Sequence, residues 1–160
     1  MKRFVCFLIA ILMLCITSCN KEIVDEAFKK DEFSIVLDSS FDEKTASGAY
    51  AYFISSDYLV VCVKDLFSSF DYAYEGYSEE QYAEVVCKSN DKSTDCIKKD
   101  MGFIYLEYTA EAKNKEYYYN SYIKKGKDAF YIITFTAKSK DDNSSENAKF
   151  MHWMSTVSVD

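Results

Sequence analysis

The chain has 160 residues, of which 49% are hydrophobic, and this suits a single domain with a real core. It carries 26 acidic and 19 basic residues, a net charge of −7, and Arg3 is its only arginine. Because arginine is the preferred partner of phosphates and guanine edges, this composition argues against binding to nucleic acid or to anionic head groups.

The N-terminal segment has the features of a secretory signal peptide. Lys2 and Arg3 precede an apolar run at residues 4–17, and small residues follow it. A membrane-spanning helix needs about 20 apolar residues, so this short run is a poor candidate for a transmembrane anchor. We therefore expect residues 1–18 to be a signal peptide that is removed.

The residues before the expected cleavage point resemble the bacterial lipobox, in which an aliphatic residue and two small ones precede a cysteine: Ile16-Thr17-Ser18-Cys19. The resemblance implies a diacylglyceryl group on Cys19 and a lipoprotein held to the cell membrane or outer membrane, facing outside the cytoplasm. Two acyl chains anchor stably, so the folded domain need not bind the membrane. The alternative is an ordinary secretory signal with an incidental cysteine. Asn20 does not distinguish the inner from the outer membrane.

The segment after the lipobox is expected to be a charged tether. Removal of Lys2 and Arg3 leaves 17 of the 19 basic residues against 26 acidic ones, a formal charge of −9. Residues 19–31 would space the domain from the bilayer, with a helical turn or two around Ile23, Val24, Ala27 and Phe28. Residues 32–160 would then form one domain.

Three strands are predicted at the start of this domain, at residues 33–37, 49–55 and 58–64. In the third strand Leu59, Val61 and Val63 face one way, and Tyr58, Val60 and Cys62 face the other. Since both faces are apolar, we expect this strand to be covered on both sides.

A helix is predicted to begin after Ser78. Ser78-Glu79-Glu80-Gln81 fits a capping box, in which the serine oxygen accepts from the first turn and the glutamine side chain reaches back. Helical spacing predicts a buried stripe of Tyr82, Val85 and Val86.

Cys87 and Cys96 flank a polar loop and are predicted to form a disulfide, with two unpaired thiols as the alternative. Cys62 lies in an apolar run and is interpreted as a buried thiol, or as a partner of one of the other two.

A second group of three strands is predicted at residues 102–110, 116–124 and 129–138, joined by short turns as an antiparallel meander. In the middle strand Glu116, Tyr118, Asn120 and Tyr122 share a face that we expect to be wet. A candidate interaction surface follows, because tyrosine is favoured at interfaces: Tyr117, Tyr118, Tyr119 and Tyr122. Packing within a sheet is the alternative role for these rings.

The last predicted helix begins near Asn143, where Asn143-Ser144-Ser145-Glu146 again fits a cap. A stripe of apolar side chains falls at i, i+3, i+4 and i+7, namely Phe150, Trp153, Met154 and Val157. His152, the sole histidine, lies off this stripe and should face solvent.

The predicted fold class is α+β: a mainly antiparallel sheet of about six strands in the order βββ-α-βββ-α, packed as an α/β/α sandwich. The chain resembles the PsbP-like superfamily of photosystem extrinsic proteins and bacterial lipoproteins of unknown role, although Asp38 stands where that family often has proline. The matching segments are Phe33-Ser34-Ile35-Val36-Leu37, Ser56-Asp57-Tyr58-Leu59-Val60-Val61, Tyr82-Ala83, Phe130-Tyr131-Ile132-Ile133-Thr134-Phe135 and Phe150-x-x-Trp153-x-Ser155-Thr156-Val157. The alternative fold is a cystatin-like or NTF2-like curved sheet wrapping a helix.

No strong catalytic, cofactor or metal motif is found. A catalytic triad would depend on His152, the acidic clusters lack the spacing of a calcium loop, and no glycine-rich phosphate loop is present. We expect no enzyme activity, no metal and no cofactor. The resemblance implies an accessory role, so the favoured function is a membrane-tethered module that binds another envelope protein. The alternative is a small-ligand-binding lipoprotein with an aromatic-lined cleft between sheet and helix.

Overall fold

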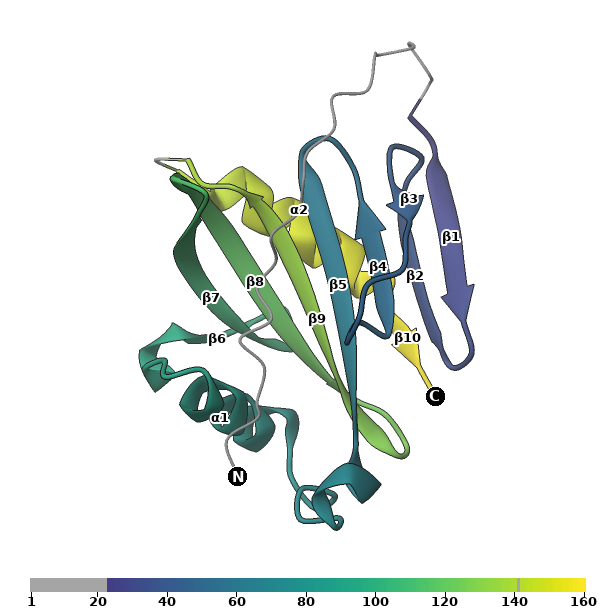
Figure 1. Cartoon of the computed structure of the whole chain (residues 1–160), viewed down its shortest axis with the longest axis vertical. Coiled ribbons are helices and arrows are strands. Elements are labelled where there is room, and N and C mark those ends of the chain that lie inside the picture. The colour runs from purple at the N-terminus through teal and green to yellow at the C-terminus, as the bar shows by residue number, and fades with distance from the viewer. Residues whose placement is uncertain (1–22, 141) are drawn as a thin grey trace.

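The computed structural model describes residues 23–140 and 142–160, and these form an α+β fold of two sheets and two α-helices (Figure 1). The strands are β1 (Asp25–Lys30), β2 (Phe33–Asp38), β3 (Asp42–Glu43), β4 (Ala51–Ile54), β5 (Tyr58–Leu66), β6 (Ile97–Asp100), β7 (Phe103–Ala112), β8 (Lys115–Lys125), β9 (Ala129–Lys138) and β10 (Ser158–Val159). The helices are η1 (Phe67–Phe70), α1 (Glu79–Ser89), η2 (Thr94–Cys96) and α2 (Ser144–Ser155). The predicted signal peptide and Cys19 lie outside the described residues.

The larger sheet has the strand order β3-β4-β5-β9-β8-β7-β6, and all of its neighbouring strands are antiparallel. The predicted meander is therefore confirmed as β7, β8 and β9. α2 packs against one face of this sheet and α1 against the other, which gives the expected layers of helix, sheet and helix (Figure 1). A curved sheet wrapping a single helix is thereby excluded.

The smaller sheet, β1-β2-β10, corrects the prediction for the tether. Residues 25–30 form a strand that pairs with β2 along its whole length, whereas a helical turn or two was expected. Phe28 packs against Phe53 at a ring distance of 4.8 Å, and Asp31 makes the turn with a φ of 49°. A distant strand and a distant ring thus decide the conformation of a segment whose own sequence is ambiguous.

β2 shows the alternation of a strand covered on one side, with Phe33, Ile35 and Leu37 buried. These side chains join the core under α2, and the Thr156 hydroxyl at the end of α2 donates to the carbonyl of Val36 at 3.2 Å. The smaller sheet and α2 therefore cover the same face of the larger sheet.

The predicted capping box of α1 is present, with the Ser78 hydroxyl accepting from the Gln81 amide and the Gln81 side chain accepting from the Ser78 amide. The buried stripe differs from the prediction, because Ala83 and Cys87 accompany Tyr82 while Val85 and Val86 are only half-buried. The ring of Tyr82 stacks on Phe130 at 4.0 Å, and this contact sets the rotation of the helix.

The apolar stripe of α2 is confirmed, since Phe150, Trp153, Met154 and Val157 are all buried. The cap is different from the predicted one. Asn143 caps no amide of the helix; Asp142 accepts from Ser144 instead, at 2.8 Å. His152 is exposed, as expected.

Two predictions about sheet faces need correction. On β5, Val60 and Cys62 are buried, but Leu59, Val61 and Val63 on the other face are only half-buried, because α1 does not reach over them. On β8, the face predicted to be wet is the covered one, where Asn120 and Tyr122 are fully buried beneath α2.

No helix within residues 23–140 or 142–160 is both long enough and apolar enough to cross a membrane.

Candidate functional site

The four tyrosines predicted as one interaction surface are divided between the two faces of β8. Successive side chains of a strand point to opposite sides, so Tyr118 and Tyr122 face α2 while Tyr117 and Tyr119 face the side of α1. Tyr118, Tyr119 and Tyr122 are buried, with exposures of 4%, 3% and 0%, and only Tyr117 is partly exposed. The predicted tyrosine surface is therefore wrong, because most of these rings pack inside the fold.

Tyr117 and Tyr119 nevertheless line an apolar pocket on the face of the sheet that α1 leaves open. Leu59, Thr136 and Tyr119 are neighbours across β5, β9 and β8, so their side chains lie side by side as its floor. The turn at residues 55–57 and Ala112 contribute its rim. The turn between β4 and β5 and the turn between β7 and β8, which follows Ala112, lie at the end of the sheet opposite the short helix η1 that follows β5 (Figure 1).

The size of this pocket limits what it can hold. Its volume is about 80 Å³. A cavity of about 150 Å³ is known to hold benzene, and sites for whole small ligands usually measure roughly 300–1,000 Å³. The pocket therefore suits one aliphatic side chain, such as a leucine or a valine, better than a complete ligand.

Aromatic contacts hold Tyr119 in place in the floor of the pocket. The ring of Tyr119 stacks on that of Tyr108 at 5.0 Å with an interplanar angle of 9°. Burial raises the pKa of Tyr119 to about 12, so its hydroxyl stays neutral over the physiological range. The Lys92 ammonium lies 4.0 Å from the centre of the Tyr108 ring, a cation–π contact that helps to hold that ring. The floor is thus preformed, and Tyr117 is the aromatic side chain at its exposed edge.

A second, larger hollow lies between the sheet and the start of α2. Its volume is about 470 Å³, and its lining is mostly polar: Glu107, Tyr108, Thr109, Tyr118, Asp142, Asn143, Ser144 and Asn147. Behind it the Asn120 amide donates to the Asn147 side-chain oxygen at 2.7 Å. Within the described residues, Asn120 Oδ1 and the Tyr122 hydroxyl are buried without a hydrogen-bond partner. This groove has the size of a ligand site, but it is not the aromatic-lined cleft that was predicted.

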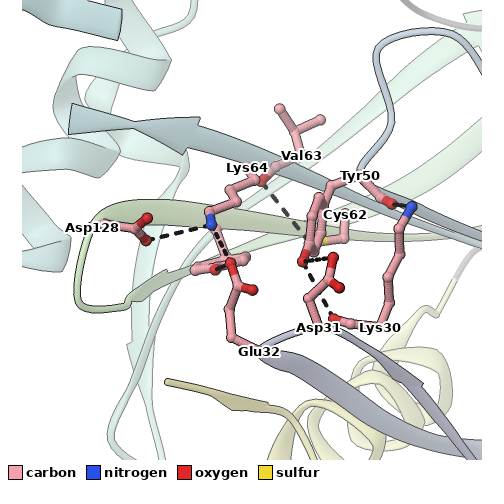
Figure 2. Close-up of polar contacts among 9 residues, drawn as sticks. Lys30, Asp31, Glu32, Tyr50, Cys62, Val63, Lys64 and Asp128 are labelled. Atoms are coloured by element: carbon pink, nitrogen blue, oxygen red, sulfur yellow. Dashed lines mark hydrogen bonds and ion pairs between the residues drawn. The ribbon is translucent and has the colours of Figure 1, made fainter. Parts of the chain in front are cut away.

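A cluster of paired charges holds the turn between β1 and β2 against the larger sheet (Figure 2). Lys64 of β5 bridges Glu32 and Asp128, lying 3.4 Å from Asp128 and closely paired with Glu32. The Tyr131 hydroxyl donates to the same Glu32 carboxylate at 2.7 Å. Hydrogen bonds from Lys64 and Tyr131 lower the pKa of Glu32 to about 2. The charges satisfy one another, so we interpret this cluster as a structural clasp.

A second polar contact fastens the start of α2. Glu146 is 3% exposed, pairs with Lys140 and accepts from the Tyr58 hydroxyl at 2.9 Å. Burial by itself would raise its pKa, but the bonds from Lys140 and Tyr58 hold the pKa of Glu146 below its ordinary value. The carboxylate predicted to cap the helix is therefore used to dock it on β5.

Neither the clasp nor the Glu146 contact was predicted from the sequence. Glu32 and Tyr131 are 99 residues apart, and Tyr58 and Glu146 are 88 residues apart. No spacing rule links residues at such distances. The only local signal was the position of Glu32 directly before the correctly predicted strand at residue 33. Many solvated carboxylates lie in such a position, so it does not indicate a clasp.

The described residues contain no group of three or more His, Cys, Asp or Glu side chains placed to hold a metal ion. Cys87 and Cys96 are brought together, with their sulfur atoms 3.4 Å apart, and Cys62 is buried on the opposite face of the sheet. The predicted disulfide stays a prediction that this contact permits.

Comparison with known proteins finds similarity only among solved structures. No family model matches the sequence. No curated protein matches it either. A crystal structure of a protein from Bacteroides thetaiotaomicron VPI-5482 is similar with a TM-score of 0.50 and 14% identity over 81% of this chain. This chain spans less than half of that protein, covering 45% of its length.

A second similar structure is the solution structure of CyanoP, the cyanobacterial PsbP of Synechocystis sp. PCC 6803. The TM-score is 0.45 and the identity is 13%, over 93% of this chain and 99% of that one. The likeness to the Bacteroides protein shows that a related arrangement of strands and helices occurs elsewhere, and it concerns the fold alone.

Proposed function

We propose that this chain is a lipid-anchored, extracytoplasmic and non-enzymatic module that docks another envelope protein. The lipobox-like residues before Cys19 support the anchor. The observation that carries the docking role is the preformed apolar pocket beside Tyr117, because its volume of about 80 Å³ matches one protein side chain. Pockets that receive a single buried side chain are typical anchors of protein interfaces.

The charge of the chain indicates what kind of partner would fit. The mature chain would carry a formal −9 and no arginine, so a partner with lysine or arginine around an aliphatic anchor would be attracted and oriented. Asp57 and Lys113 lie at the pocket and would distinguish partners by the charge beside the anchor. The exposed edge of Tyr117 supplies the amphipathic ring that interfaces favour.

The test is a co-purification from native membranes, with the full chain cross-linked before extraction. Ala112→Leu is designed to narrow the pocket at its rim, and Tyr117→Ala removes its exposed ring. The proposal predicts a stoichiometric partner that both variants lose. Tyr72→Ala is the matched control, since Tyr72 is 60% exposed and follows η1 in the chain, and η1 lies at the other end of the larger sheet (Figure 1). Equal recovery of the partner by all variants would contradict the proposal.

The groove beside α2 supports a second candidate function, binding of a small polar ligand. Its volume of about 470 Å³ lies within the range of ligand sites. Its carboxylates, Glu107 and Asp142, and its amide side chains suit a ligand that carries several hydrogen-bond donors. Native mass spectrometry of gently purified protein should then show a bound small molecule that Asn147→Ala loses and Tyr117→Ala retains.

A further inference from the structure

Cys87 and Cys96 form a pair whose surroundings favour a covalent bond between them. Their sulfur atoms are 3.4 Å apart, and the residues are nine positions apart in the chain. Cys87 lies in the last turns of α1 and is fully buried against the sheet, while Cys96 ends η2 and is half-buried. A disulfide has a sulfur–sulfur distance of about 2.05 Å, so the two atoms need to approach by roughly 1.4 Å.

The loop between the two cysteines is held in place without the bond. The Lys92 amide donates to the Cys87 carbonyl at 2.9 Å, which folds the chain back immediately after α1. The Ser93 hydroxyl accepts from the Asp95 amide at 3.2 Å, and the Cys96 amide donates to the Ser93 carbonyl at 3.3 Å. A loop with this much local hydrogen bonding already presents the two sulfurs to each other, so bond formation needs little backbone movement.

The third described cysteine is not a competitor. Cys62 points into the core under α2, whereas Cys87 points into the core under α1, on the other side of the sheet. A sheet therefore separates Cys62 from both members of the pair. Of the pairings left open by the sequence, the fold permits only Cys87 with Cys96.

We propose that Cys87 and Cys96 are a site of oxidative modification and form an intramolecular disulfide outside the cytoplasm, with a protein or small-molecule disulfide as the oxidant. The bond would join the end of α1 to the start of β6, at the edge of the larger sheet. It would fix α1 over its half of the sheet and leave the pocket beside Tyr117 unchanged. The bond does not depend on the docking role, but it rests on the extracytoplasmic location proposed above.

The order of the two exchange steps follows from exposure. Cys96 is the more exposed thiol, so its thiolate attacks one sulfur of the oxidant and displaces the other sulfur as a thiolate. Burial and the contact with Cys96 raise the pKa of Cys87 to about 12, which makes Cys87 the slower, resolving thiol. Cys87 attacks Cys96 Sγ and gives up its proton, and the second oxidant sulfur leaves and takes up a proton as a thiol. Two cysteine thiols are thereby oxidised to one disulfide, and the oxidant disulfide is reduced to two thiols.

The experiment uses the full chain, expressed with its own N-terminus in a host with an oxidising envelope, and quenched with acid before the remaining thiols are alkylated. Peptide mapping without reductant should give a fragment that joins Cys87 to Cys96, lighter than the two reduced peptides by two hydrogen masses. Cys62 should be recovered alkylated. Recovery of Cys87 and Cys96 both alkylated, or a fragment that contains Cys62, would overturn the proposal.

A second measurement distinguishes the effect of the disulfide on stability from the effect of the substitutions themselves. Glutathione disulfide should raise the Tm of the reduced wild-type chain by several degrees, since closing the loop restricts the unfolded chain. Cys96→Ser keeps a half-buried polar atom and should fold, but it should show no such rise. Cys62→Ala is the matched control and should show the same rise as the wild type. A rise that persists in Cys96→Ser, or no rise in the wild type, would contradict the proposal.

Discussion

The two faces of the larger sheet differ in how completely they are covered. On one face α2 and the smaller sheet together bury a continuous aromatic core that includes Phe135, Phe150 and Trp153. On the other face α1 covers only the part around Leu106 and Phe130. Val61 and Val63 of β5 lie beyond this part and are half-buried. The α2 face, which is closed, provides most of the core that stabilises the fold. The α1 face, which is half-open, contains the pocket. The half-open face leaves apolar side chains such as Leu59 and Val61 only partly covered, as a binding surface requires.

The largest effect is expected from the closed face. Trp153→Ala removes a ring that is 4% exposed and contacts Phe41, Tyr58 and Phe135. We expect a loss of about 3–5 kcal/mol in the free energy of unfolding, because transfer and cavity costs add. Denaturant unfolding measures it. A loss below about 1 kcal/mol would mean that α2 is not seated on the sheet as described.

A matched pair on one strand compares the two faces directly. Val60 is 0% exposed and faces α2, whereas its neighbour Val61 is half-buried on the other face. Val60→Ala should lower the free energy of unfolding by about 2–3 kcal/mol. Val61→Ala should lower it by less than about 1 kcal/mol, because the Val61 side chain is in contact with water in the folded as well as in the unfolded chain. Chemical denaturation of the two variants provides the comparison. Equal losses would show that the second face is as well covered as the first.

The clasp at Glu32 should make the attachment of the smaller sheet sensitive to acid. The folded pKa of Glu32 is about 2, below its ordinary value of 4.5. A lowered pKa stabilises the folded state above the ordinary value, and this contribution is lost as the pH falls from about 4.5 towards 2. The Tm of the wild type should therefore exceed that of Glu32→Gln at neutral pH, and the two should converge on acidification.

The control for this titration is Glu26→Gln, which alters an exposed carboxylate of β1 on the same small sheet. Its Tm should follow that of the wild type across the whole pH range. A difference between the wild type and Glu32→Gln that stays constant down to pH 2 would refute the clasp.

The smallest effect on stability is expected at the pocket. Tyr117 is only partly exposed, but it lies at the edge of the half-open face, where removal of its ring leaves a groove that water can fill. Tyr117→Ala should cost less than about 1 kcal/mol, and Tyr117→Phe should be close to neutral. Thermal unfolding measures both. A loss of several kcal/mol would make Tyr117 a core residue and remove it from the proposed docking site.

Features that depend on residues close together in the chain were mostly predicted correctly, and features that depend on distant segments were mostly not. The capping box at Ser78 and the stripe of α2 depend on neighbours within one or two helical turns, and both predictions were confirmed in those respects. The conformation of residues 25–30 depends on pairing with β2 and on Phe53, which no local pattern reveals. The prediction of which face of β8 is buried was wrong for the same reason. Alternation identified two faces, but only the position of α2 decides which one is buried.

The candidate site was predicted in part. The tyrosines of β8 were singled out for their composition, and two of them do line the pocket. Their partners there, Leu59 and Thr136, come from strands adjacent in space and distant in the chain, so the pocket could not be derived from spacing.

Site-specific photo-crosslinking is the sharpest test of whether the pocket beside Tyr117 docks another protein. A photoreactive phenylalanine analogue would replace Tyr117 in the full, membrane-anchored chain, with the same analogue at Tyr72 and at Thr109 as references for an exposed site and for the polar groove. We expect one strong protein adduct from position 117, little from position 72, and loss of the adduct when Ala112→Leu is added. Equal labelling from positions 117 and 72, or an adduct that persists when Ala112→Leu narrows the pocket, would contradict the docking role.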